Sequence, residues 1–373
     1  MTREESRELL LGEIRERLTR LQSLPATVNM EFTGKCHVKP PCTYCVGKNA
    51  ESYEEPGHIS DETLSEYWPY LHQARRVNDC TYGELQLYPG HETVIRRLSD
   101  ARVRFGFTTI GQLLTEKRSR FLIQHADSVE FAVSMNAATE ETYYKYQGGG
   151  FPIVVRNLKR FVELNNEIRP GKQLPMVLSY IVMRGNQHEV FPFLRLAASL
   201  GIDRIILRHI FDMRAGTFSA SSFGYHFKYE EERLGYPDYL QLRSEIDAAG
   251  EFSGLNINFE WKPEESFIQE QAEDGIDIPC LFPWKFLCIR PLHDVYTPCC
   301  FLKRSIALPS EKSVDEVWNG EVMVGMRTEL AAGKIPHYCR TYGDACPLVL
   351  QSFRTAPAPL PPQDFVQIAA APV

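Results

Sequence analysis

The chain has 373 residues, of which 43% are hydrophobic, and a formal net charge of −7. This length and composition are typical of a globular protein that buries a substantial core. The acidic balance, without long runs of Lys or Arg, argues against nucleic acid as a partner. No segment approaches the roughly 20 apolar residues of a membrane helix, and the charged N-terminus lacks the apolar core of a secretory signal. We therefore expect a cytoplasmic protein without a membrane partner.

Residues 1–24 place apolar side chains at helical spacing and predict an amphipathic helix that ends before Pro25. Short β-branched or aromatic runs then alternate with helical patterns. Strands are expected at 28–32, 77–83, 103–109, 128–135, 176–182 and 204–210. Helices are expected between them, for example at 62–72, 112–124, 153–165 and 189–200.

Successive strand–helix units predict parallel strands joined by right-handed crossovers, which is an α/β architecture. The six strands in residues 25–250 predict a partial (β/α)6 barrel of the TIM type, with its chemistry on the loops that follow the strands. Within this range the aromatic and glycine-rich stretch 211–239 is interpreted as a lid insertion. Residues 251–350 form a smaller cysteine-containing domain, and the Pro- and Ala-rich tail 351–373 is expected to be flexible.

Ten cysteines are the most unusual feature of the composition. Without a secretory signal they are better explained as metal ligands than as disulfides. Cys36, Cys42 and Cys45 fall within ten residues, in the segment GKCHVKPPCTYC. Three thiolates can bind three irons of a [4Fe–4S] cluster and leave the fourth iron open to another ligand. The spacing also leaves open a zinc site completed by His37 or a distant cysteine.

This segment resembles the cluster-binding loop of the radical S-adenosylmethionine (SAM) superfamily, although the first gap is two residues longer than usual. Further segments resemble the family in order and distance, namely CTYGELQLYPG, FTTIGQLLTE, SVEFAVSMNAATEETYYKYQGG and VMRGNQHEVFPFLRLAASLGIDRIILRH. The resemblance implies that SAM is contacted by Tyr44, Gly83, Glu84, Ser134, Asn136, Arg184, Asn186 and Arg208. Each of these polar residues also has a purely structural interpretation, such as a helix cap.

The region from Cys280 to Pro347 resembles the twitch or SPASM-like domain that follows the barrel in one branch of the superfamily. The resemblance implies one auxiliary [4Fe–4S] cluster. Its expected ligands are Cys280, Cys299, Cys339 and Cys346, with Cys300 as the alternative to Cys299. Four thiolates saturate one such cluster.

The resemblance implies an enzyme that cleaves SAM reductively to a 5′-deoxyadenosyl radical, which abstracts a hydrogen atom from a substrate. Its electron donor is expected to be a protein such as flavodoxin or ferredoxin. The remaining Cys80, Cys288 and Cys300 are either inert buried residues or hydrogen-atom donors to the substrate radical.

The short segment before the first strand favours a small molecule, such as a sugar or aminocyclitol of specialised metabolism, and the reaction is expected to be dehydrogenation or epimerisation. The alternatives are a radical SAM enzyme that modifies a ribosomal peptide, and a noncatalytic iron–sulfur or zinc protein.

Overall fold

The computed structural model describes residues 3–45, 48–49, 55–210, 218–260, 276–299, 304–343, 346 and 348–349. By their contacts the residues divide into two compact units, each assembled from separate stretches of the chain. The first unit comprises Met1–Phe32, Pro56–Cys80 and Lys262–Val373, and the second comprises Thr33–Glu55 and Thr81–Trp261. The predicted domain boundaries stay predictions.

The first unit contains a run of four strands with β1 (Thr27–Met30) in its interior. Strand β1 pairs in parallel with β2 (Arg76–Asp79) on one side and with β10 (Phe286–Arg290) on the other. A hairpin pairs β10 antiparallel with β11 (Val295–Thr297). Consequently the three parallel strands of this unit direct their carboxyl ends the same way.

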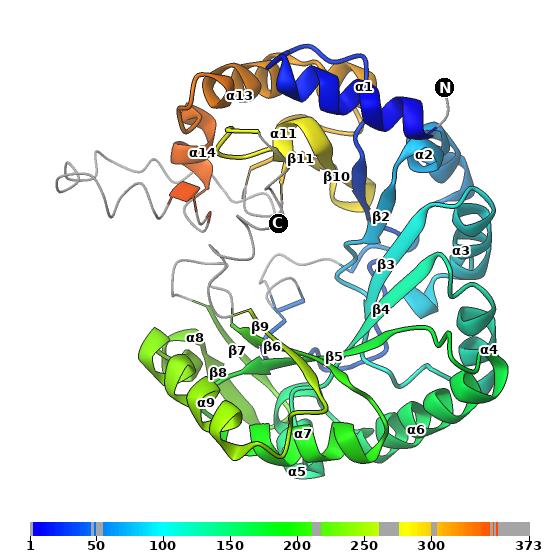
Figure 1. The fold of residues 1–373 in the computed structure, drawn as a ribbon, viewed down its shortest axis with the longest axis vertical. Helices are drawn as coiled ribbons and strands as arrows, with labels where there is room; N and C mark the ends of the chain where they lie inside the picture. Colours follow the sequence, from blue (N-terminus) through cyan, green and yellow to red (C-terminus); the bar gives the residue numbers. More distant parts are fainter. Residues whose placement is uncertain are drawn as a thin grey trace. The chain divides into compact units, whose positions relative to one another are not determined.

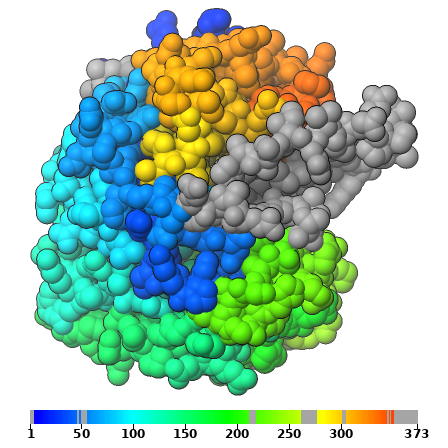
Figure 2. Space-filling model, turned by 180° about the vertical axis from the view of Figure 1, so that it is seen from behind, coloured from blue at the N-terminus to red at the C-terminus, as the bar shows by residue number. Residues whose placement is uncertain are grey.

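Helices surround these strands. They are α1 (Arg3–Arg15), α2 (Asp61–Gln73), α11 (Phe282–Lys285), α12 (Val314–Trp318), α13 (Glu321–Ala331) and α14 (His337–Tyr342). Helix α1 is shorter than predicted, because Arg17 adopts the left-handed conformation with φ of 57°. The indole nitrogens of Trp284 and Trp318 donate to the carbonyls of Leu18 and Ser23, at 2.8 and 2.7 Å. These bonds join the segment after α1 to the C-terminal helices, which form one continuous surface with the β10–β11 hairpin (Figure 2).

The second unit contains five parallel strands in the order β3 (Arg104–Thr109), β4 (Val129–Ser134), β5 (Met176–Val182), β6 (Arg204–His209) and β9 (Asn256–Glu260). Its main helices are α3 (His91–Asp100), α4 (Glu116–Gln124), α5 (Glu140–Gln147), α6 (Phe151–Ile168), α7 (Val190–Ser199) and α9 (Tyr236–Ala249). Helices α4 and α6 lie along one side of the strands (Figure 1). Stacked Phe107 and Phe131, with Phe161 of α6 edge-on to Phe131, form part of the core between them.

The parallel strands and helical crossovers confirm the predicted α/β class. Two parallel strands lie beyond the six predicted for residues 25–250: β9 pairs with β6, and β10 pairs with β1. In neither unit do the described strands close into a barrel.

Residues 218–239 of the predicted lid form the hairpin β7 (Ser219–Ser222) and β8 (Tyr225–Lys228), helix α8 (Tyr229–Glu232) and the start of α9. Residues 211–217 and the predicted flexible tail 351–373 lie outside the described residues. Among the helices that are described, none has the length and apolar character needed to cross a membrane.

Candidate functional site

The loop that carries Cys36, Cys42 and Cys45 in the second unit is fixed by hydrogen bonds to its backbone. The side-chain amide of Asn49 donates to the carbonyls of Cys42 and Cys45, at 2.8 and 2.9 Å. Burial raises the pKa of the Cys42 thiol, and the negative charges of Cys45 and Cys36 raise that pKa further. The three thiols therefore lie within electrostatic range of one another.

A buried lysine accompanies these thiols. The Lys48 side chain is 7% exposed, and its ammonium donates to the carbonyl of Gly34 and lies 3.9 Å from a carboxylate oxygen of Glu55. Burial raises the pKa of the Cys36 thiol, whereas the charge of Lys48 acts to lower it. Glu55 also accepts a 3.3 Å hydrogen bond from the backbone N–H of Cys36. A positive charge is thus placed beside these thiols, and thiols bind metals as thiolates.

Gly83 lies directly against the start of the cysteine loop. A Cβ atom at this position would lie 2.3 Å from the carbonyl oxygen of Lys35 and 2.9 Å from that of Thr33. The next residue, Glu84, donates its backbone N–H to the same Lys35 carbonyl at 2.8 Å. Glycine is therefore required here by the close approach of two backbone segments.

The carboxylate of Glu84 is buried and bonded to the end of β3. Its Oε2 accepts from the hydroxyl of Thr109 and from the backbone N–H of Ile110, each at 3.0 Å. Burial raises the pKa of Glu84, and the hydrogen bonds from Ile110 and Thr109 act against that rise. Glu84 thus contacts two segments: its backbone is bonded to Lys35 before the cysteine loop, and its carboxylate is bonded to the end of β3.

Tyr44, Ser134 and Asn136 are brought together at the end of β4. Burial raises the pKa of Tyr44, and a side-chain hydrogen bond with Ser134 acts to lower it. The side chain of Gln147 accepts from the N–H of Asn136 at 2.8 Å and donates to the carbonyl of Ser134 at 2.9 Å. Gln147 therefore fixes the turn on which both predicted contact residues lie.

Asn136 provides an observation that bears directly on cofactor binding. Its side chain is fully buried, and its Oδ1 accepts from the N–H of Ile181 at 2.8 Å. Its Nδ2 has no hydrogen-bond partner among the described residues. A buried donor left without an acceptor costs free energy, so such atoms in native proteins normally have a partner. An oxygen of a bound cofactor, such as a carboxylate or ribose hydroxyl, fits this position.

The remaining predicted contact residues have other partners. Asn186 donates from Nδ2 to the carbonyls of Asn136 and Ile181 and accepts at Oδ1 from the N–H of Met183. Arg208 pairs with Glu260 on β9, at 2.9 Å. Arg184 has an exposed side chain.

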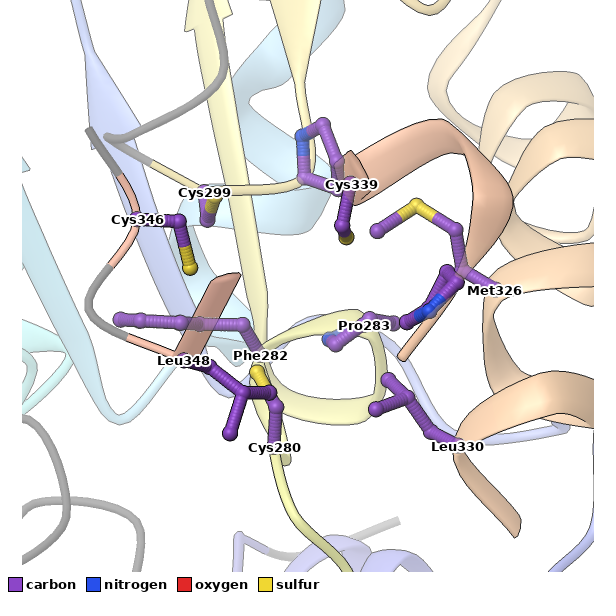
Figure 3. Close-up of a pocket in the computed structure, with 11 residues that line it drawn as sticks. Cys280, Phe282, Pro283, Cys299, Met326, Leu330, Cys339, Cys346 and Leu348 are labelled. Atoms are coloured by element: carbon purple, nitrogen blue, oxygen red, sulfur yellow. The ribbon is translucent and has the colours of Figure 1, made fainter. Parts of the chain in front are cut away.

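Four cysteines line one small cavity in the first unit. Cys280 precedes α11, Cys299 follows β11, Cys339 lies on α14 and Cys346 follows that helix. Their side chains face a common space (Figure 3). Burial raises the pKa of the Cys339 thiol to about 12, with a further contribution from the charge of Cys346. Cys300 lies outside the described residues.

Apolar side chains complete this lining. The other residues are Phe282, Pro283, Pro298, Met326, Leu330, Pro336 and Leu348. Within the described residues, no three His, Cys, Asp or Glu side chains lie close enough to share a single metal ion. Thiols spread around a cavity fit a cluster, because its irons and sulfides lie between the thiolates.

Cys80 and Cys288, two of the predicted hydrogen donors, meet in the first unit. Their sulfur atoms are 3.8 Å apart, with the thiol of Cys288 donating to Cys80. Cys288 is buried and Cys80 is partly exposed. The structure thus brings together two thiols that are 208 positions apart in the chain.

Sequence reasoning missed the polar residues that support these sites. Lys48, Asn49 and Glu55 lie outside the cysteine motif, and no spacing rule identifies them. Gln147 is not among the predicted contact residues, although it bonds to two of them. Glu232 was also missed: it is buried and accepts from the hydroxyl of Tyr146 at 2.9 Å and from the N–H of Gly185 at 3.0 Å.

A comparison with protein-family models finds no match. The chain is 28% identical over 163 residues to a protein named "Probable GTP 3′,8-cyclase" from Saccharolobus islandicus strain Y.N.15.51, and this covers 43% of the chain and 48% of that relative. Proteins of the same name from other strains of that organism give the same identity and coverage. The chain thus spans about half the length of the curated relatives it matches.

Two solved structures share the fold. SuiB from Streptococcus suis, bound to precursor peptide SuiA, has a TM-score of 0.61 with 14% identity, covering 86% of this chain and 70% of SuiB. The protein anSMEcpe, with bound AdoMet and Cp18Cys peptide, has a TM-score of 0.56 with 14% identity, covering 88% of this chain and 95% of its own. The shared fold and the similarity to the curated relatives support the resemblance to the radical SAM superfamily that the sequence motifs indicate.

Proposed function

We propose that the chain is a radical SAM enzyme that acts on a small polyhydroxylated substrate, such as a sugar or aminocyclitol. The observation that supports this proposal most directly is the backbone contact between Gly83–Glu84 and Lys35. This contact holds the three-cysteine loop against the Gly83–Glu84 segment. The curated relatives are named as probable GTP 3′,8-cyclases, which supports a small molecule as the substrate.

Each group of residues has a separate task. When bound, a reduced [4Fe–4S] cluster would supply the electron that cleaves SAM and releases the hydrogen-abstracting 5′-deoxyadenosyl radical. Cys36, Cys42 and Cys45 would hold three of its irons, and Lys48 would offset its negative charge. Asn136 would donate from Nδ2 to an oxygen of SAM.

Cys280, Cys299, Cys339 and Cys346 would hold an auxiliary cluster in the first unit. Their placement around one apolar cavity supports this assignment. The cavity walls exclude water from the four thiolates, and second-sphere groups of this kind tune the potential of a cluster.

The thiol pair supports epimerisation. Cys288 would return a hydrogen atom to the substrate radical, so that its S–H bond breaks as a C–H bond forms. The sulfur radical left behind would take one electron from a donor such as flavodoxin or ferredoxin, and a proton from solvent, to restore the thiol. Without such a return the substrate radical would lose a proton to solvent, and an auxiliary cluster held by the four cysteines would accept its electron, which gives dehydrogenation.

A peptide substrate is the second candidate. It is favoured by the SuiB and anSMEcpe structures, which are described as bound to a precursor peptide and to a Cp18Cys peptide. The two candidates differ in their ligands, because a peptide maturase would bind and turn over a peptide and leave free sugars unchanged.

The test is anaerobic incubation of the reconstituted protein with SAM and dithionite, followed by measurement of 5′-deoxyadenosine. The wild type should form it and Cys42→Ala should not. Candidate sugars, aminocyclitols and peptides are then supplied in D2O, where epimerisation places deuterium on one carbon of the product. Turnover of peptides only would refute the small-molecule assignment. Bound zinc, or bound iron without SAM cleavage, would instead indicate a noncatalytic metal protein.

A further inference from the structure

A polar cluster lies at the carboxyl ends of three neighbouring parallel strands in the first unit. Glu31 follows β1, Cys80 follows β2, and Arg290 is the last residue of β10. Because Met30 is aligned with both Asp79 and Ile289, these next residues along the three strands lie level with one another. In α/β proteins, ligands bind at the carboxyl ends of such strands.

Glu31 uses only one of its carboxylate oxygens. The side chain is fully buried, and Oε1 lies 3.2 Å from Nη2 of Arg290 and 2.7 Å from Nδ1 of His293. Its Oε2 is buried and has no hydrogen-bond partner among the described residues. A buried acceptor without a hydrogen bond destabilises the folded protein, and a ligand that donates a hydrogen bond to it would remove this cost.

We propose that Oε2 of Glu31 accepts a hydrogen bond from a hydroxyl group of the substrate, in a subsite formed by Glu31, Arg290 and the Cys80–Cys288 pair. This inference rests on the proposed function, because it assigns the substrate of that reaction. The positive charge of Arg290 already offsets the carboxylate, so a neutral O–H donor completes the cluster without adding a buried charge. An anionic ligand would meet the unpaired carboxylate oxygen and be repelled.

The thiols lie in the same local field as this carboxylate. The charge of Arg290 acts to lower the pKa of both Cys80 and Cys288, and the charge of Glu31 acts to raise both. Cys80 is partly exposed, so the cluster borders the surface of its unit. A hydroxyl bound to Glu31 would therefore bring the carbon that carries it toward a thiol, where a returned hydrogen atom changes its configuration.

The test uses myo-inositol as the probe, with the full reconstituted chain, and measures its dissociation constant by calorimetry. In Glu31→Gln the remaining oxygen keeps its contacts with Arg290 and His293, while an amide NH2 replaces Oε2 and presents a donor in place of an acceptor. We expect binding at least tenfold weaker than in the wild type.

The matched control is Glu13→Gln. Glu13 is also a buried carboxylate of the first unit, but both of its oxygens are bonded, to Ser23 and to the N–H of Gln22. This variant should bind myo-inositol as the wild type does. Thermal unfolding of both variants checks that each is folded.

A second measurement needs no variant. Bound myo-inositol should slow the alkylation of Cys80 by iodoacetamide in the wild type, as measured by mass spectrometry of the peptide that contains it. Unchanged affinity in Glu31→Gln, a wild type that does not bind myo-inositol, or alkylation of Cys80 at the same rate with and without it would each overturn the subsite. Formation of 5′-deoxyadenosine without substrate tests the proposed function separately, since that reaction does not require Glu31.

Discussion

The backbone N–H of Glu84 donates a 2.8 Å hydrogen bond to the carbonyl oxygen of Lys35, the residue immediately before Cys36. The loop that would hold the SAM-binding cluster is therefore fixed to the segment that would receive SAM. The shape of one determines the shape of the other, and changes at this contact should affect metal content and SAM cleavage together.

Gly83→Ala should disrupt this contact. Its Cβ would lie 2.3 Å from the carbonyl oxygen of Lys35, so the backbone of one segment must move. We expect iron content to fall by about four per chain, the irons of one cluster, and 5′-deoxyadenosine formation to be lost. Gly254→Ala is the control, because nothing lies within 4 Å of its added Cβ. Normal iron content in Gly83→Ala would contradict the prediction.

Lys48→Met should make the SAM-binding cluster harder to reduce. The substitution keeps an apolar side chain but removes a positive charge that acts on Cys36 and Cys45. A loss of about 1 kcal/mol of electrostatic stabilisation corresponds to a midpoint potential about 40 mV more negative for a one-electron couple. Electron paramagnetic resonance during a redox titration measures the shift.

Lys39→Met is the matched control for Lys48, since Lys39 also pairs with Glu55, at 2.9 Å, but is 67% exposed. Its effect should be smaller, because solvent screens an exposed charge. Equal shifts in the two variants would show that burial of Lys48 has no influence on the potential.

Cys280→Ala should remove the auxiliary cluster selectively. Its thiol is one of four that line the apolar cavity, and three thiolates do not saturate a four-iron cluster. We expect a loss of about four irons per chain, while SAM cleavage without substrate continues. Cys288→Ala, which removes a thiol outside the cavity, should keep the wild-type iron content. If Cys280→Ala keeps it as well, the cavity holds no cluster.

Glu189 should make stability depend on pH. Burial acts to raise its pKa, but hydrogen bonds from Thr139, Ala138 and Thr142 outweigh burial and lower it below 4.5. The folded state therefore gains stability from the carboxylate above the unfolded pKa, and loses it as pH falls through the lowered folded pKa. Glu189→Gln should be about 1–3 kcal/mol less stable than the wild type at pH 7, because hydrogen bonds to a charged group are lost.

Urea unfolding at pH 7, 5 and 3.5 measures the difference between Glu189→Gln and the wild type. The difference should stay constant between pH 7 and 5 and shrink at 3.5. Exposed Glu163, which pairs with Arg160 at 3.2 Å, provides a control variant to Gln with little effect at any of these pH values. A difference that is unchanged at pH 3.5 would assign the stabilisation to side-chain shape and not to charge.

Sequence patterns predicted the strands well because each carries β-branched or aromatic residues between turn signals. Helix α1 was predicted too long, because the apolar pattern continues through residues 18–24 although the positive φ of Arg17 ends the helix before them. Pairing of β10 with β1 was not predicted, since a short apolar run gives no information about its distant partner.

In the candidate site, too, features set by neighbours in sequence were predictable and features set by distant strands were not. Short-range spacing was enough to predict Cys36, Cys42 and Cys45 as ligands, because ligands on one loop are close in sequence. The contact of Cys80 with Cys288 and the Glu31–Arg290 pair depend on strands that meet only in the folded chain. The hydrogen bonds of Asn186 and the ion pair of Arg208 likewise required three-dimensional structure, because either side chain is chemically suited to contact a cofactor.

The parallel pairing of β1 with β10 joins Thr27 to Phe286, so one neighbour of β1 is synthesised long after β1 itself. Until then β1 presents an unpaired edge to other nascent chains. Closing so long a loop is slow, because its entropy must be lost before the pairing is gained. Production of this protein should therefore benefit from low temperature and abundant chaperones, because both give β10 time to pair with β1 before the exposed edge of β1 aggregates.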